Sequence, residues 1–477
     1  EGAVGDTCEP EEPIYDEGFA VVAWGGPSFG GDASSAMPEI SGGVVEVFAT
    51  NGAFAALKAD GSVVTWGQAT AGGDSSTVAD QLSAGVVTIS GGASAFAALK
   101  ADGSVVTWGL SSTGGDSTGV AADLSGGVIE LFCSGYAYAA LKSDGSVVTW
   151  GGSNSGGDSS AVADQLSSNV VTVFSADQAF AALKDDGSVV TWGSSWQGGD
   201  SSAVEDQISG GVIKVVPASQ SFAALKDDGS VVTWGDAGSG GDSSAVADDL
   251  SGGIVDVFSN AAAFAALKAD GTLVTWGDPD SGGDSSAVAL ELSLSAIVRV
   301  FSTGHAFAAL TEAGTIVTWG DPTRGADSSS VVNQLIGVVN VFSNSVAFAA
   351  LRDDGSLITW GRTDYGGDSS SVAADLSSNV VKVYSNGYAF AALKDDGSVV
   401  TWGFDMRGGD SSLVAAQIAA DVVGVSPGGY AFAALKQVAT DPTCDGIDDD
   451  CDGLTDEGYV PDEGCFLPGA CALENVS

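Results

Sequence analysis

Hydrophobic and polar residues follow a pattern along this chain that repeats about every 42 residues. One unit, 170–193, contains three short apolar runs, VVTVFS, AFAALK and SVVTWG, with the alternation or the β-branched and aromatic content of strands. Asp185-Asp186-Gly187 separates the second run from the third and is typical of a tight hairpin, because glycine tolerates a positive φ. Each unit is therefore predicted to form an antiparallel meander of three strands.

A tryptophan in the third run marks every copy of the unit. These residues are Trp24, Trp66, Trp108, Trp150, Trp192, Trp234, Trp276, Trp319, Trp360 and Trp402. A fixed period of this size indicates a repeat architecture, in which each unit buries its apolar surface on its neighbours. The segment after the tryptophan, such as GGDSSAVADQLS at 156–167, is predicted to break the strand and to begin a short capped turn.

Alanine is unusually frequent in the second run, as at Ala179, Ala181 and Ala182, although alanine is a poor strand former. We expect crowding to explain it, with the second strands converging on a central axis where only small side chains fit. Phe180 and Leu183 would then fill the wider gaps between neighbouring sheets. This interpretation favours sheets arranged radially.

The two ends of the array are complementary. Residues 18–25 (GFAVVAWG) read as a lone third strand, whereas the last copy stops after AFAALKQ at Gln437 and lacks a third strand. Pairing the two would complete the last sheet and remove the exposed sheet edges. The fold class predicted is therefore all-β, a closed propeller of ten repeats of about 42 residues whose N-terminal strand completes the last blade. An open β superhelix is the alternative.

The run ALKDDGSVVTWG at 182–193 resembles the core motif of the regulator-of-chromosome-condensation type β-propeller, and the likeness recurs over nearly all of 18–437. The resemblance implies the blade of that family. The following segment departs from it, because GGDSS stands where the family usually has G-Q-L-G. This departure does not support the family's role as an exchange factor bound to nucleosomes, and many relatives are interaction platforms.

The chain carries 62 acidic and 15 basic residues, a net charge of −47. Such a charge would repel phosphate backbones and anionic membranes, so nucleic acid is excluded as a partner, while divalent cations would be attracted. No apolar run is long enough for a transmembrane helix. The first residues lack a signal-peptide pattern, so we expect a processed form. The composition divides the chain into an acidic tail at 1–17, the repeat array at 18–437 and an Asp/Cys-rich module at 438–477.

The C-terminal module carries the clearest chemical motif, CDGIDDDCDGLTDE at 444–457. Its spacing reproduces the start of a calcium loop, in which alternate oxygens converge on a hard cation before a glycine turn. Tyr459 stands where an EF-hand has glutamate, so a full EF-hand is not expected. The candidate ligands are Asp448, Asp450, Asp452, Asp456 and Glu457.

The same string resembles a short metal-binding motif of secreted bacterial surface proteins, a group that includes a copper-binding family, and less closely the calcium repeats of thrombospondins. Oxygen ligands favour Ca²⁺ over copper.

Four of the six cysteines gather in this module, which indicates a small disulfide-stapled unit and an oxidising, extracellular compartment. Cys444 with Cys451, and Cys465 with Cys471, are the local pairings expected. Cys133 stands where most copies have serine and is expected to be a buried thiol. Cys8 is then left over and could cross-link subunits.

Two charged positions recur through the array. Ten aspartates at one position, from Asp32 to Asp410, would form either caps of the following turns, which we favour, or a ring of cation or ligand sites. Nine bases share another position, and where Thr311 replaces the base, Ala313 replaces the aspartate two residues on. We interpret these charges as hairpin ion pairs rather than as an anion-binding ring.

Catalysis finds little support in the sequence. The single histidine, His305, stands where other copies have tyrosine, glutamine or alanine, and no nucleophile–base set is assembled by spacing. We therefore expect a secreted, non-catalytic structural or adhesive protein of the cell surface that binds calcium and self-associates. The alternative is an extracellular propeller that binds a glycan or a protein, for which Trp196, Tyr365 and Phe404 offer stacking surfaces.

Overall fold

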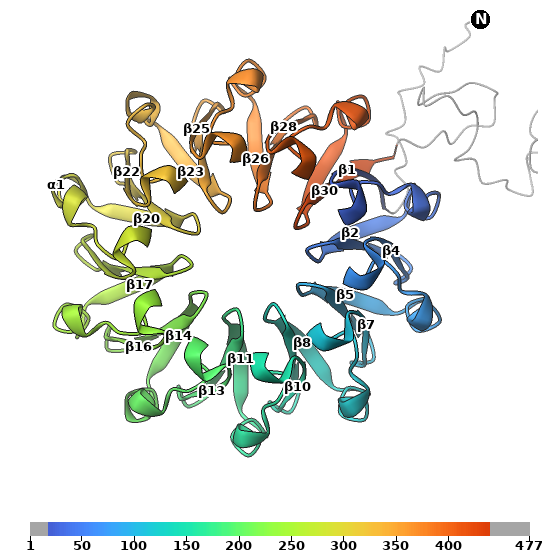
Figure 1. Cartoon of the computed structure of the whole chain (residues 1–477), viewed down its shortest axis with the longest axis horizontal. Coiled ribbons are helices and arrows are strands. Elements are labelled where there is room, and N and C mark those ends of the chain that lie inside the picture. Colours follow the sequence, from blue (N-terminus) through green and yellow to red (C-terminus); the bar gives the residue numbers. More distant parts are fainter. Residues whose placement is uncertain (1–17, 439–477) are drawn as a thin grey trace, which may run out of the picture.

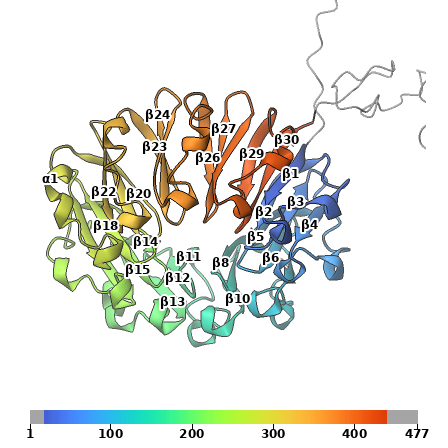
Figure 2. The same cartoon turned by 45° about the horizontal axis from the view of Figure 1, so that its top comes forward.

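A computed structural model describes residues 18–438, in which three-stranded antiparallel sheets are arranged around a central opening (Figure 1). Two neighbouring sheets, β29-β30-β1 (residues 422–437 with 19–25) and β2-β3-β4 (residues 44–67), are joined by the pair Phe19↔Val44. In each sheet the first strand borders the opening, the second lies in the middle and the third lies outside, and the tilted view in Figure 2 shows the same succession. The prediction of an all-β array of three-stranded meanders is confirmed.

The strands fall into three equivalent sets. The first strands are β2 Val44–Ala49, β5 Val86–Gly91, β8 Val128–Cys133, β11 Val170–Ser175, β14 Val212–Pro217, β17 Ile254–Ser259, β20 Ile297–Ser302, β23 Val338–Ser343, β26 Val380–Ser385 and β29 Val422–Pro427. The middle strands are β3 Ala53–Lys58, β6 Ala95–Lys100, β9 Ala137–Lys142, β12 Ala179–Lys184, β15 Ser221–Lys226, β18 Ala263–Lys268, β21 Ala306–Thr311, β24 Ala347–Arg352, β27 Ala389–Lys394 and β30 Ala431–Gln437. The outer strands are β1 Phe19–Gly25, β4 Val63–Gly67, β7 Val105–Gly109, β10 Val147–Gly151, β13 Val189–Gly193, β16 Val231–Gly235, β19 Leu273–Gly277, β22 Ile316–Gly320, β25 Leu357–Gly361 and β28 Val399–Gly403.

Two short 3₁₀ turns follow each outer strand. The proximal turns are Pro27–Phe29, Ala69–Ala71, Ser111–Thr113, Ser153–Ser155, Ser195–Gln197, Ala237–Ser239, Pro279–Ser281, Pro322–Arg324, Thr363–Tyr365 and Asp405–Arg407. The distal turns are Ser34–Ala36, Ser76–Val78, Thr118–Val120, Ser160–Val162, Ser202–Gln207, Ser244–Val246, Ser286–Val288, Val332–Gln334, Ser370–Val372 and Ser412–Val414. One α-helix, α1 Ala289–Leu292, follows a distal turn within the described residues.

The hairpin between the middle and outer strands forms for the reason the sequence indicates. Gly187 has φ 77°, in the left-handed region that a side chain disfavours. The Oδ1 atom of Asp186 accepts from the backbone N–H of Ser188 at 2.9 Å, so the turn is closed by its own side chain. β12 then pairs with β13 in register from Ala179↔Gly193 to Leu183↔Val189.

The repeated alanines do not line the central axis, where the sequence predicted them. They lie in the middle strands and not in the first strands, which border the opening (Figure 1). Both faces of a middle strand are covered by neighbouring sheets: Ala179 and Ala181 of β12 pack in one cluster with Phe222 of β15. Alanine is needed because the phenylalanine of the next sheet occupies the space that a larger side chain would fill. The expected crowding at the axis is therefore wrong, and the expected role of phenylalanine between sheets is right.

Each repeat tryptophan joins its sheet to the preceding repeat. The indole Nε1 of Trp234 donates to the carbonyl of Gly198 at 3.0 Å, and Gly198 lies in the turn that follows the previous outer strand. The ring stacks on Phe222 with centroids 5.4 Å apart. A Cβ on Gly198 would lie 2.6 Å from Phe222 Cδ2, so glycine is the residue that fits there.

The first and last strands of the array meet. β1 pairs with β30 over seven positions, from Phe19↔Gln437 to Gly25↔Ala431, as the complementary ends predict. Trp24 Nε1 donates to Gly408 at 3.1 Å, which repeats the interior tryptophan contact across this seam.

Candidate functional site

Three positions of the repeat that vary strongly among the copies lie together at one end of the sheets. They are the residue before the middle strand, the residue after the outer strand, and the last residue of the proximal turn. Two hydrogen bonds hold them side by side: the backbone N–H of Phe404 donates to Tyr388 O at 3.0 Å, and the side-chain Nδ2 of Asn386, two residues before Tyr388, donates to Arg407 O at 2.8 Å. We call this end of the array the variable face.

The variable face carries most of the chemical diversity of the array. Before the middle strand stand Gly52, Ser94, Tyr136, Gln178, Gln220, Ala262, His305, Val346, Tyr388 and Tyr430. After the outer strand stand Gly26, Gln68, Leu110, Gly152, Ser194, Asp236, Asp278, Asp321, Arg362 and Phe404. The proximal turns end at Phe29, Ala71, Thr113, Ser155, Gln197, Ser239, Ser281, Arg324, Tyr365 and Arg407. Because the frame is nearly identical in every copy, these positions are where one sheet differs chemically from the next.

Six of these side chains form one continuous group, which we call the aromatic–arginine cluster. Its members are Phe29, Tyr365, Tyr388, Phe404, Arg407 and Tyr430. Ring centroids are 5.3 Å apart for Tyr365 and Tyr388, and 5.8 Å apart for Tyr365 and Phe404. Tyr430 lies 5.5 Å from Tyr388 and 4.6 Å from Phe29. The cluster thus extends across three neighbouring sheets and includes the seam between the last repeat and the first.

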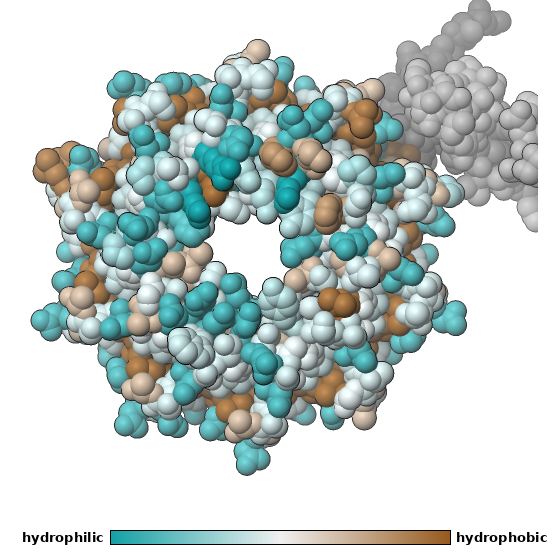
Figure 3. Space-filling view, in the orientation of Figure 1, coloured by the Kyte–Doolittle hydropathy of each residue, from teal (hydrophilic) through white to brown (hydrophobic). Residues whose placement is uncertain are grey.

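Arg407 is the centre of the cluster. Its guanidinium carbon lies 4.0 Å from the ring centroid of Tyr388 and 4.1 Å from that of Tyr430, so the cation lies against two adjacent aromatic rings. Figure 3 shows strongly hydrophilic side chains close to hydrophobic ones beside the opening, over the sheets that contain β23, β26 and β30. All five aromatic residues are partly exposed, so their rings are accessible from solvent.

The neighbouring arginines are compensated by carboxylates. Arg362 makes a two-pronged contact with Asp364, at 2.9 Å from Nε and 3.1 Å from Nη2. This contact lowers the pKa of Asp364 and raises that of Arg362. Arg362 also covers the Tyr365 ring at 4.2 Å, and so extends the aromatic surface as a neutral pair.

The sequence-based aromatic candidates are only partly brought together. Tyr365 and Phe404 stack in the cluster, whereas Trp196 is 80% exposed in a distant proximal turn and has no aromatic partner within residues 18–438. Sequence reasoning missed Phe29, Tyr388, Arg407 and Tyr430. The signal that could have found the two tyrosines is that both precede AFAAL in consecutive copies.

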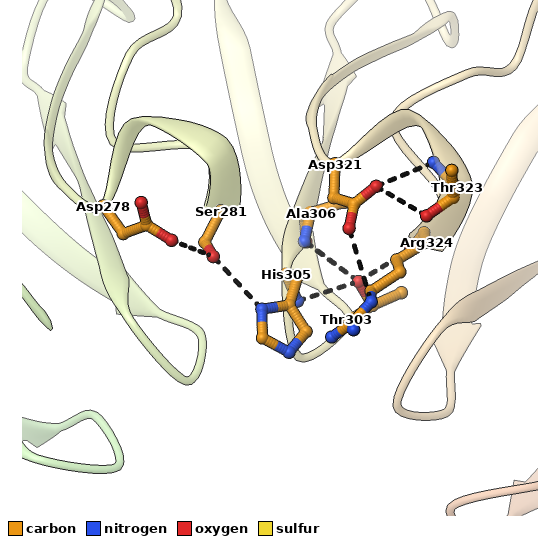
Figure 4. Close-up of polar contacts among 8 residues, drawn as sticks. All are labelled: Asp278, Ser281, Thr303, His305, Ala306, Asp321, Thr323 and Arg324. Carbon is orange, nitrogen blue, oxygen red and sulfur yellow. Dashed lines mark hydrogen bonds and ion pairs between the residues drawn. The ribbon is translucent and has the colours of Figure 1, made fainter.

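A second polar group on the variable face involves the single histidine (Figure 4). Ser281 Oγ donates to Asp278 Oδ2 at 2.6 Å and lies 3.1 Å from His305 Nδ1, which makes the histidine nitrogen the donor. Burial, with Arg324 nearby, lowers the pKa of His305. The carboxylate contacts the serine rather than the histidine, and Ser281 is 2% exposed, so this order does not generate an activated nucleophile.

Nine of the ten recurring aspartates cap the distal turns, as we favoured from the sequence, and Asp327 caps the turn that immediately precedes the distal turn Val332–Gln334. Each Oδ1 accepts from the backbone N–H two residues on, as between Asp200 and Ser202 at 3.0 Å. The others are Asp32, Asp74, Asp116, Asp158, Asp242, Asp284, Asp327, Asp368 and Asp410. The backbone hydrogen bond from Ser202 holds the pKa of Asp200 below its ordinary value. Among residues 18–438, no three His, Cys, Asp or Glu side chains are grouped to hold a metal ion.

The predicted hairpin ion pairs are wrong for the lysines. Lys184 Nζ donates to the carbonyl of Gln165 at 2.9 Å, and Asp186 is occupied by the hairpin N–H. The extended lysine side chain reaches the Gln165 carbonyl, which is left without a backbone partner among the described residues at the end of the distal turn. This fixed acceptor lies closer to the lysine Nζ than the Asp186 carboxylate does. Arg352 is the exception, with Nη2 3.4 Å from Asp354 Oδ2. In the copy where Thr311 replaces the lysine, helix α1 stands at the end of the distal turn. The segment that provides the carbonyl acceptor in other copies therefore has a different backbone conformation in this one.

The predicted metal site lies outside the described residues. This holds for Asp448, Asp450, Asp452, Asp456 and Glu457, for the four C-terminal cysteines and for Cys8. Cys133 is described: it is a partly buried thiol that donates to Gly91 O at 3.3 Å, and burial raises its pKa. Within residues 18–438, no helix is long and apolar enough to cross a membrane.

No protein-family model and no curated protein matches the chain. Among solved structures, human WBSCR16 is 15% identical with a TM-score of 0.34, over 88% of this chain and all of its own. Yeast RCC1 (Prp20) is 16% identical with a TM-score of 0.33, over 65% of this chain and 80% of its own. The CRINKLY WD40 ectodomain of ACR4 from Arabidopsis thaliana is 15% identical with a TM-score of 0.33, over 56% and 92%. At these scores the likenesses carry no argument, so the fold rests on the strand pairing and the function on the site.

Proposed function

We propose that the chain is a closed, ten-bladed propeller that recognises a ligand on its variable face and does no catalysis. Closure is supported by the pairing of β1 with β30 along its length and by the Trp24 contact with Gly408. In a closed ring the N-terminal strand completes the last sheet, so β30 is not left as an exposed edge that could pair with other chains.

The aromatic–arginine cluster is the observation that carries the recognition function. Large, partly exposed aromatic side chains gather from three sheets into one surface, while the equivalent positions of the other sheets hold mostly small or polar residues, with Tyr136, Leu110 and Val346 as isolated exceptions. An array that served only as a scaffold would need no such departure from its own repeat. Clustered aromatic residues and arginine are also the side chains that most often dominate binding energy.

Of the two functions expected from the sequence, we favour an extracellular propeller that binds a glycan or a protein over a structural or adhesive protein. Secretion, attachment at a cell surface, calcium binding and self-association stay predictions that rest on the acidic tails and on the Asp/Cys-rich module at 438–477. They are compatible with recognition, because such a module could attach the ring to a surface while the variable face binds.

Binding to immobilised saccharides, neutral and acidic, tests the proposed function. We expect the wild-type protein to bind a subset of them and the double variant Tyr365→Ser/Phe404→Ser to lose that binding. Trp196→Ser is the matched control, because it removes an exposed aromatic residue that lies outside the cluster, and it should bind as the wild type does. Equal binding by the wild type and the double variant would place recognition elsewhere and refute the proposal.

A further inference from the structure

Arg407 differs from three of the other four arginines of the chain. Arg324, Arg352 and Arg362 each lie within 3.4 Å of an aspartate oxygen, whereas Arg299 makes no ion pair within residues 18–438 but donates to Asn340 Oδ1 at 3.4 Å. In the described part of the chain, no carboxylate lies within ion-pair distance of Arg407, although the protein carries a net charge of −47. Arg407 therefore keeps an uncompensated positive charge on a surface that could readily have supplied an aspartate.

The guanidinium also lacks hydrogen-bond acceptors. Nη1 of Arg407 is buried without a hydrogen-bond partner, and within residues 18–438 its side chain makes no hydrogen bond at all. A buried donor left unpaired costs about 1–3 kcal/mol, and more when it is charged. Such a group in a folded protein calls for a compensating role, and an absent anionic ligand would provide one.

The surroundings fix the orientation of this cation in advance. The guanidinium packs against the adjacent rings of Tyr388 and Tyr430 at 4.0 and 4.1 Å, and these contacts reduce the side-chain entropy that remains to be lost on binding. The planar fork of arginine matches the two oxygens of a carboxylate. Phe404, whose ring centroid lies 5.9 Å from the guanidinium carbon, continues the aromatic surface beside it.

The local charges limit what kind of anion would bind. Asp364 and Asp405 lie at exposed positions in the two adjacent proximal turns, and the whole protein is strongly acidic. A dense polyanion would be repelled by this field, whereas one carboxylate per binding unit would meet mainly the guanidinium. The aromatic faces beside the cation carry negative π density, which attracts the weakly positive C–H faces of a sugar ring.

We propose that Arg407 is the carboxylate-binding residue of a subsite for acidic saccharides of the uronate type. The carboxylate accepts hydrogen bonds from the guanidinium, and the sugar ring stacks on Phe404 and Tyr365. This inference rests on the proposed recognition function and names the ligand class of the same site.

Calorimetric titration of the full chain with trigalacturonic acid tests the inference, and its neutral methyl ester is the matched ligand control. We expect the acid to bind, the ester to bind at least tenfold more weakly, and Arg407→Gln to lose the same factor for the acid, equivalent to about 1.4 kcal/mol. Arg407→Lys keeps the charge without the fork and should bind with intermediate affinity. Arg352→Gln removes an arginine outside the variable face and should leave the affinity unchanged.

Three outcomes overturn the inference. One is equal affinity for acid and ester, another is equal affinity in the wild type and Arg407→Gln, and the third is no binding of the acid. If the ester binds as tightly as the acid and Phe404→Ala abolishes that binding, the recognition function stands while the carboxylate subsite is wrong. If triglutamate binds as tightly as trigalacturonic acid and needs Arg407, the anion subsite is right but the saccharide class is wrong. Thermal melting of each variant checks that its fold is intact.

Discussion

Replacing Trp24 or Trp234 by phenylalanine gives a direct test of ring closure. Trp24 lies in the N-terminal strand and Trp234 in an interior sheet, and their rings are 3% and 4% exposed. Each indole donates to a buried glycine carbonyl of the preceding repeat, Gly408 at 3.1 Å and Gly198 at 3.0 Å. The two substitutions therefore remove equivalent contacts, one at the seam and one away from it.

The structure gives the size of the effect. Phenylalanine cannot donate, so a buried carbonyl is left without its partner at a cost of about 1–3 kcal/mol. If the smaller ring leaves roughly 40 Å³ of the indole volume empty, the cavity adds about 1 kcal/mol. We therefore expect each variant to lose about 2–4 kcal/mol, and the double variant to lose the sum within about 0.5 kcal/mol, since the sites are far apart.

Native-state hydrogen exchange measures the free energy of local opening in β30 for Trp24→Phe and in β15 for Trp234→Phe. In a closed ring both values fall by the same amount. If Trp234→Phe loses stability and Trp24→Phe does not, the seam is open in solution and the ten-bladed ring is wrong. If neither variant loses stability, the tryptophan–glycine contact contributes less than we have reasoned.

The remaining predictions concern the repeat contacts and the tail. Because the pKa of Asp200 is lowered in the folded state, its cap stabilises the fold above the unfolded pKa of about 3.9, and this stabilisation is lost as the pH falls through the folded pKa. Asp200→Asn should therefore reduce the acid dependence of unfolding measured by circular dichroism. An unchanged acid dependence would contradict the cap. A double-mutant cycle with Lys184→Gln and Asp186→Asn should give a coupling energy under about 0.3 kcal/mol, whereas a hairpin ion pair would give a larger value that falls with added salt. Ala181→Leu should destabilise the fold by about 1–3 kcal/mol in urea titrations, because Phe222 of the next sheet occupies the space; a neutral effect would show that the sheets can separate. Asp450→Asn should weaken calcium binding in calorimetric titrations of the full chain, and unchanged affinity would remove this residue from the predicted site.

Much of the fold follows from the sequence because its determinants are local. Asp186-Gly187 specifies a hairpin that forms, and Asp200 caps the distal turn that follows it through a neighbour two residues away. The complementary ends at 18–25 and 431–437 predicted the pairing of β1 with β30, since an unpaired strand and an incomplete hairpin fit one another. The metal motif at 448–457 is also a local pattern, and it stays a prediction.

The sequence-based predictions were wrong where the partner of a side chain is distant in the sequence. Lys184 has an aspartate two residues away, yet the turn places the Gln165 carbonyl within its reach, and spacing along the chain does not show that acceptor. The alanines of β12 correctly indicated crowding. The sequence did not show whether the crowding comes from a central axis or, as the structure has it, from Phe222 of the neighbouring sheet.

The candidate site shows the same division. The sequence by itself determined the repeated three-stranded unit, its hairpin and caps, and the complementary ends, because these depend on residues within one turn or one period of the chain. Only the tertiary structure brought Phe29, Tyr388, Phe404, Arg407 and Tyr430 together, across more than 350 residues between the first and the second of them. The physical reason is that neighbouring sheets place equivalent positions side by side, so a surface forms between copies that no single copy contains.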